Sequence, residues 1–249
     1  MKSITLAAFL LLAAASSAQT IIPSGTVLPV KLNSSLNTRK IKAGQEISGS
    51  LAQDVPLASD AKIRARTKLR GHIMAVTRSS GGTGARLTFR FETLDVSRQP
   101  VSVTTSLRAI ASMFEVDQAQ VPASGLNLGT PTSAWVTRQI GDEADYHGGW
   151  AVTNGPDVVG KSVLSGGVLV RPTSWPWTPC RGEVDQNHEL QAFWLFASDA
   201  CGSYGFGDLT IAHAGRTDPV GQIVLSSEKG DINVRGGSGL LLRVTGTTH

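Results

Sequence analysis

Short stretches of alternating apolar and polar residues recur along the chain, and they constrain the fold more than any other feature. Every second side chain in such a stretch is apolar, which is the period of a β-strand with one buried face. Glycine, serine and asparagine bound the stretches, as is typical of turns. The clearest apolar faces are Leu28, Val30 and Leu32; Leu87, Phe89 and Phe91; and Val101, Val103, Thr105 and Leu107.

More strands are expected near the carboxyl end, at residues 190–197, 209–213, 222–225, 232–235 and 240–244, with a hairpin turn at 228–231. The run Ser-Ser-Gly-Gly-Thr-Gly at 79–84 predicts a hairpin connection or a longer loop. Residues 132–140 are compatible with a short helix, but 27 glycines in 249 residues favour turns over long helices. The sequence therefore predicts an all-β protein in which short antiparallel strands form a β-barrel or sandwich.

The first eighteen residues have the pattern of a signal peptide. Lys2 precedes an apolar run at residues 4–15, and small residues end at Ala18, after which cleavage is expected. The run is too short for a transmembrane helix, which needs about 20 residues. These features predict an exported protein, periplasmic or extracellular, with no transmembrane segment after cleavage.

Charge divides the chain near residue 115. Residues 19–112 hold 14 Lys or Arg against 5 Asp or Glu, whereas residues 113–249 hold 8 against 14, so the total of +4 conceals two opposite surpluses. Residues 116–132 contain two prolines and two glycines and resemble a linker or crossing loop. We therefore expect a basic β-barrel-like domain at 19–115 and an acidic β-rich domain at 116–249.

The two cysteines, Cys180 and Cys201, both lie in the exported part. An even count in an oxidising compartment predicts a Cys180–Cys201 disulfide in the second β region. Closing a loop of this length would add roughly 3 kcal/mol of stability in the chain-entropy model.

A run of alternating cations is the clearest candidate binding surface. Lys62, Arg64, Arg66, Lys68 and Arg70 occupy every second position. An unbroken strand would present them as a row with a spacing of about 6.6 Å. Such a row could bind an anionic polymer, an envelope protein or the acidic half of this chain. The alternative is an ordinary solvated strand face whose repulsion salt reduces.

Two other groups of residues suggest different functions. Asp199, Asp208 and His213 lie near expected strand ends and are weak candidates for a hydrolase site, although no G-x-S-x-G motif occurs. Trp175 and Trp177 could stack on sugar rings, but tryptophans beside a disulfide more often pack against it.

Residues 155–162 match the Walker A pattern, but the helix that a phosphate-binding loop requires would meet Gly166, Gly167 and Pro172. We therefore expect no nucleotide. Likewise, no cofactor, no metal and no nucleic acid are expected.

Two stretches carry family resemblances. Residues 22–32, 42–56 and 63–71 resemble the β-barrel repeat of TrbI-type components of conjugation and type IV secretion channels, and this likeness extends to about residue 108. Residues 187–244, with Cys201 and the Gly215–Gly221 segment, resemble a group of uncharacterised exported bacterial proteins that join such a β-domain to a disulfide-bearing tail. The resemblance implies export and architecture, and no activity.

The leading interpretation is an exported, non-enzymatic β-protein that binds or assembles with an envelope component through its basic first half. A hydrolase with a site in the carboxyl-terminal half and a glycan-binding module are the two alternatives.

Overall fold

The computed structural model describes residues 22–57, 61–119, 144–145, 151–154, 157–161, 192–197 and 200–246. Several sequence predictions lie outside these residues: the signal peptide at 1–18, the helix at 132–140, and the site candidates Trp175, Trp177, Cys180 and Asp199. They stay predictions.

The architecture is mostly β, as the alternating pattern predicts. One large sheet has the order β15-β9-β19-β1-β3-β6-β7-β17-β16, and β8 also pairs with β7. Its strands are β1 (Val27–Leu32), β3 (Glu46–Leu51), β6 (Lys68–Thr77), β7 (Ala85–Val96), β8 (Gln99–Ser102), β9 (Thr104–Ala111), β15 (Gly202–Tyr204), β16 (Leu209–His213), β17 (Ile223–Ser227) and β19 (Gly239–Gly246).

Smaller pairings join β2 (Leu36–Asn37) to β18 (Asn233–Val234), β4 (Val55–Pro56) to β5 (Lys62–Ile63), and β13 (Ala192–Phe193) to β14 (Phe196–Ala197). A separate ladder contains β10 (Ala144–Asp145), β11 (Ala151–Asn154) and β12 (Asp157–Lys161). A single helix, α1 (Met113–Ala119), is assigned within the described residues.

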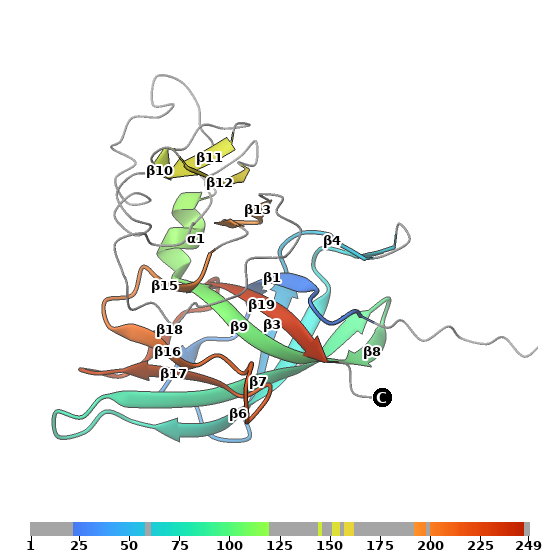
Figure 1. Cartoon of the computed structure of the whole chain (residues 1–249). Helices are drawn as coiled ribbons and strands as arrows, with labels where there is room; N and C mark the ends of the chain where they lie inside the picture. Colours follow the sequence, from blue (N-terminus) through green and yellow to red (C-terminus); the bar gives the residue numbers. More distant parts are fainter. Residues whose placement is uncertain are drawn as a thin grey trace, which may run out of the picture.

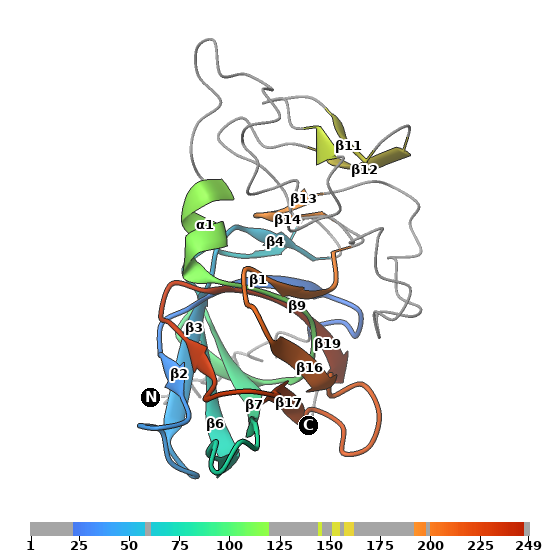
Figure 2. The same cartoon turned by 90° about the vertical axis from the view of Figure 1, so that its left-hand side faces the viewer.

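The large sheet differs from the predicted barrel or sandwich in three ways. β15 runs parallel to β9, so the sheet is mixed. β6 and β7 have 10 and 12 residues and are long strands. The sheet curls round an interior (Figure 2), but its ladder ends at β15 and β16 and does not close. The Leu107 N–H of β9 donates to the Ala214 carbonyl beyond β16, at 2.8 Å.

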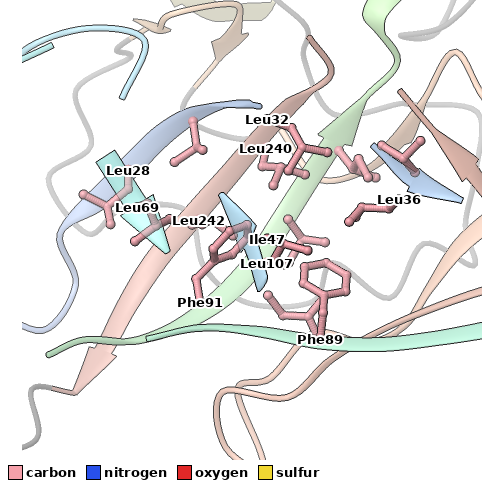
Figure 3. Packing of buried hydrophobic residues seen from close by; sticks show 14 of the residues in the cluster. Leu28, Leu32, Leu36, Ile47, Leu69, Phe89, Phe91, Leu107, Leu240 and Leu242 are labelled. Atoms are coloured by element: carbon pink, nitrogen blue, oxygen red, sulfur yellow. The ribbon is translucent and has the colours of Figure 1, made fainter. Parts of the chain in front are cut away.

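The concave side of the sheet encloses one apolar core (Figure 3). The alternating residues predicted to face inward do so: Leu87, Phe89 and Phe91 are at most 1% exposed. Phe89 and Phe91 also meet edge to face, with ring centroids 5.9 Å apart. Strand faces could therefore be predicted from the local sequence.

The predicted boundary near residue 115 does not separate two β units in the described chain. β1 lies between β19 and β3, and β7 lies between β17 and β6, so strands from both sides of residue 115 alternate in one sheet (Figure 1). Their side chains share the same core, which includes Leu28 of β1 and Leu240 of β19. The apolar faces of these strands become buried only when the segments before and after residue 115 pack together, because neither segment forms the whole sheet around the core.

The local turn predictions had different outcomes. Residues 79–84 connect β6 to β7, so the hairpin connection is confirmed. The hairpin at 228–231 is wrong, because β17 pairs with β7 and β16 while β18 pairs with β2. Residues 190–197 were expected to form one strand, but Trp194, with a φ of 58°, lies in a turn between β13 and β14.

The Walker A pattern falls on a strand. Its residues 157–161 form β12, in which Gly160 pairs with Val152 and Lys161 with Ala151 of antiparallel β11. An antiparallel strand directs its backbone N–H groups to its neighbours, whereas a phosphate-binding loop converges them before a helix.

Candidate functional site

The predicted cationic row is not one strand. Lys62 is the first residue of the two-residue strand β5, and Lys68 is the first residue of β6. The residues between the two strands form a turn in which the Arg64 carbonyl accepts from the Thr67 N–H at 3.2 Å. Arg66 in this turn has a φ of 67°, which is left-handed backbone. The Asp54 carboxylate stabilises the turn by accepting from the Ala65 N–H at 2.8 Å. An evenly spaced row therefore does not form.

Carboxylates of the first half neutralise three of the five cations. Asp54 lies 2.7 Å from the Lys62 ammonium and 3.4 Å from the Arg64 guanidinium. The Arg70 guanidinium lies 2.5 Å from Asp95. Hydrogen bonding to Lys62 and to the Ala65 N–H lowers the pKa of Asp54 to about 2. Arg66 and Lys68 have no ion pair among the described residues, so two cations of the predicted row are available.

A second basic region, which the sequence analysis missed, lies where β6 continues past the end of β3. The last paired residue of β3 is Glu46, opposite His72. Beyond it the segment 38–45 lies along β6: the Gly44 N–H donates to the Ile73 carbonyl at 2.8 Å, and the Arg78 Nε donates to the Thr38 carbonyl at 3.1 Å. Between these two attachments is a shallow hollow of about 540 Å³. We call it the basic hollow; its lining residues are Ile41, Lys42, Ala43, Val76, Thr77 and Arg78.

Asp231, from the segment between β17 and β18, ties the two sides of the basic hollow together. Its carboxylate accepts from the Thr38 hydroxyl at 2.9 Å and from the Arg39 Nε at 2.5 Å on one side. It accepts from the Ser79 N–H, next to Arg78, at 3.2 Å on the other. The bond from Arg39 is the main cause that lowers the pKa of Asp231, followed by the bond from Thr38.

The charge balance of the basic hollow differs from that of residues 62–70. Its lining contains Lys42 and Arg78 and no carboxylate. Neither cation has an ion pair among the described residues, and the nearby Asp231 pairs with Arg39. Arg78 is anchored through its Nε, which leaves its two terminal nitrogens for an oxyanion. The arrangement can therefore bind an anionic group.

The residues proposed for a hydrolase are not brought together. The Asp208 carboxylate accepts from the Ser227 hydroxyl at 2.6 Å and from the Lys229 N–H at 3.2 Å, and these bonds stabilise a turn. Its pKa is lowered, mainly by the bond from Ser227. His213 lies at the other end of β16, and its ring contacts backbone atoms of Gly215, Asp218 and Gln222. Asp199 lies outside the described residues.

A second hollow, of about 360 Å³, lies where β8 and β17 occupy the same edge of β7. Its lining comes from residues 90–93 of β7, residues 102–104 and residues 220–221, and includes Glu92, Ser102 and Val220. Arg90 is the one Lys or Arg in its lining, and its guanidinium is already paired with Glu92, at 2.6 Å. This hollow therefore has no unpaired cation with which to bind an anion.

Two chemically reactive side chains, those of Cys201 and Glu115, are buried. Cys201 is 5% exposed and is not a free thiol. Its pairing with Cys180 stays a prediction. Glu115 of α1 is 2% exposed, and its Oε2 has no hydrogen-bond partner within the described part of the chain. Burial raises the pKa of Glu115 to about 7. This buried carboxyl was not a site candidate in the sequence.

No protein-family model matches the chain, and no curated protein matches it. In the described part of the chain, no helix combines the length and the hydrophobicity that a membrane-spanning helix needs. The same residues contain no group of three or more histidine, cysteine, aspartate or glutamate side chains placed to hold a metal ion.

Proposed function

We propose that this protein is an exported, non-enzymatic β-protein that binds an anionic component of the cell envelope through the basic surface of its large sheet. One observation carries the proposal: the described residues 22–57, 61–112 and 200–246 contain 18 Lys or Arg against 8 Asp or Glu. Folding the carboxyl-terminal strands onto the first half does not cancel the surplus, because residues 200–246 are balanced, with 4 cations and 4 anions.

The acidic surplus lies elsewhere. Residues 113–199 hold 10 Asp or Glu against 4 Lys or Arg. Among the described residues, the ion pair that joins the two halves is Arg39 with Asp231, at 2.5 Å; the others lie within the first half. A basic surface of this size attracts anionic polymers, lipids or acidic proteins, and salt weakens such attraction.

The proposal also includes export from the cytoplasm, a TrbI-like barrel fold in the first half, and a role in assembly. The signal-peptide pattern at residues 1–18 supports an envelope location, and the resemblance of residues 22–108 supports an assembly role. The hydrolase alternative has less support, since Asp208 directly precedes β16 and His213 is its last residue, which separates them by about 16 Å along an extended strand. The glycan-binding alternative depends on Trp175 and Trp177, outside the described residues.

The test combines fractionation with binding. The secreted or periplasmic protein is crosslinked at low salt, and its neighbours are identified by mass spectrometry. In parallel, the purified mature protein is applied to dextran sulfate resin and eluted with sodium chloride. We expect retention at low salt and an anionic neighbour. Passage through the resin at low salt would contradict the proposal, and loss of a hydrolytic turnover in His213→Ala would favour the alternative.

A further inference from the structure

We infer that the basic hollow between residues 41–43 and 76–78 is a binding site for a phosphate group. The inference rests on the proposed function and deepens it, because it assigns one site and one ligand chemistry to a surface that is basic as a whole.

The charge of the site favours phosphate. A phosphate monoester carries a charge of about −1.5 to −2 at neutral pH and offers three acceptor oxygens. The basic hollow presents two cations, Lys42 and Arg78, and no carboxylate in its lining. A single carboxylate ligand would leave one of these cations uncompensated.

The donor geometry also favours phosphate. The Arg78 Nε donates to the Thr38 carbonyl at 3.1 Å, which anchors the guanidinium at the rim, and its terminal nitrogens have no partner among the described residues. Arginine binds phosphate with two parallel hydrogen bonds, and lysine adds a point charge. Lys42 is exposed on the segment that forms the opposite side of the basic hollow, so its ammonium adds a second positive charge to the site.

The site is formed before any ligand arrives. Asp231 bonds Thr38 and Arg39 on one side and the Ser79 N–H on the other. Because these bonds join segments that are 193 and 152 residues apart along the chain, they fix the width of the basic hollow. A preformed site reduces the entropy that binding must overcome.

The apolar floor and the open shape of the basic hollow indicate what kind of molecule the phosphate group belongs to. Ile41 is buried at 3% exposure and Val76 is half-buried, so the floor is apolar. An apolar floor beside two cations suits a phosphate attached to a larger molecule. A lipid headgroup and a soluble phosphate share this chemistry, and the experiment below separates them.

The experiment titrates the mature protein with inorganic phosphate while backbone amide shifts are recorded by NMR. Cosedimentation is measured with vesicles of phosphatidylcholine alone and of phosphatidylcholine with equimolar phosphatidic acid. The variants are Lys42→Gln and Arg78→Gln. The matched control is the double variant Arg66→Gln/Lys68→Gln, which removes more charge from an unpaired part of the 62–70 segment. Near-ultraviolet circular dichroism verifies the fold of each.

We expect saturable shifts centred on residues 41–43 and 76–78. Each single variant should weaken binding by about tenfold, the effect of losing one hydrogen bond to a charged group. The control should change it by less than about twofold, since distant exposed charges are screened. Lys42→Gln changes an exposed side chain that has no hydrogen bond among the described residues, so it tests the site even if Arg78→Gln disturbs the fold.

Binding to phosphatidic acid vesicles assigns the site to a lipid headgroup, whereas saturable phosphate binding without vesicle binding assigns it to a soluble phosphate. Equal weakening by the control, shifts spread over the surface, or no saturable binding of either probe would each overturn the inference. In those cases, salt-sensitive retention on dextran sulfate would still support the proposed function. Loss of that retention would contradict both the proposed function and the phosphate site.

Discussion

Two basic regions near opposite ends of β6 differ in how much of their charge is available. Residues 62–70 have the higher density of cations in the sequence, yet Asp54 and Asp95 pair with Lys62, Arg64 and Arg70. The lining of the basic hollow, near the other end of β6, includes Lys42 and Arg78, and neither has an ion pair among the described residues. The difference teaches that binding charge depends on which carboxylates the fold brings near.

The largest expected effect comes from destabilising β6, the strand that lies between the two basic regions. Gly71 lies in β6, and a Cβ atom there would lie 1.9 Å from the Arg90 carbonyl of β7. Gly71→Ala must therefore push β6 and β7 apart, and we expect a loss of about 3 kcal/mol of unfolding free energy. Urea denaturation measures it. Gly207→Ala, where a Cβ would meet nothing within 4 Å, is the control, and equal losses in both variants would contradict the explanation.

Glu115 contrasts with the paired carboxylates Asp54 and Asp95, because it is buried and has no ion pair among the described residues. Burial raises its pKa to about 7 from an ordinary 4.5, so the folded protein binds a proton that the unfolded chain releases. Its favourable contribution is complete below pH 4.5 and is lost as the pH rises towards 7. Glu115→Gln should therefore flatten the decline in stability across this window, as measured by urea denaturation at several pH values. An unchanged slope would show that Glu115 titrates normally.

Asp54 tests whether pairing conceals the charge of residues 62–70. Asp54→Asn should release Lys62 and Arg64, so the variant should elute from dextran sulfate at a higher salt concentration than the wild type. Because its pKa is lowered to about 2 from 3.8, Asp54 stabilises the fold above pH 4 and less as the pH falls towards 2. The variant should lack this acid-dependent loss. Asp95→Asn is a parallel variant for Arg70, and unchanged elution in both would contradict the comparison.

The smallest effect is expected at the turn that interrupts the cationic row. Arg66 has a φ of 67°, a conformation that glycine adopts more easily than arginine. Arg66→Gly should change stability by no more than about 0.5 kcal/mol, because relief of backbone strain opposes the entropy lost by glycine. Thermal unfolding provides the measurement. A loss well above this value would indicate that the Arg66 side chain itself stabilises the turn.

Much of the secondary structure could be predicted because it depends on local pattern. The burial of β7 follows the period of two, and β16 occupies the expected residues 209–213. In β1 the predicted face of Leu28, Val30 and Leu32 is buried, but Val27 and Pro29 on the other face are buried as well. Helix α1 was missed because seven residues are too few to show a clear helical period. The hairpin at 228–231 was wrong because its turn composition is local, whereas the partners of β17 and β18 are β7 and β2, far away in the sequence.

The sequence by itself determined that this chain is β-rich, which side chains of β7 face the core, and that residues 19–112 hold 14 cations against 5 anions. The tertiary structure decided which charges are neutralised and where a basic hollow forms. The reason is distance along the chain: Asp231 reaches Thr38 across 193 residues, and Arg78 reaches Thr38 across 40. The alternation of apolar and polar residues depends on neighbouring residues, whereas a binding site depends on contacts between distant residues that form only in the folded sheet.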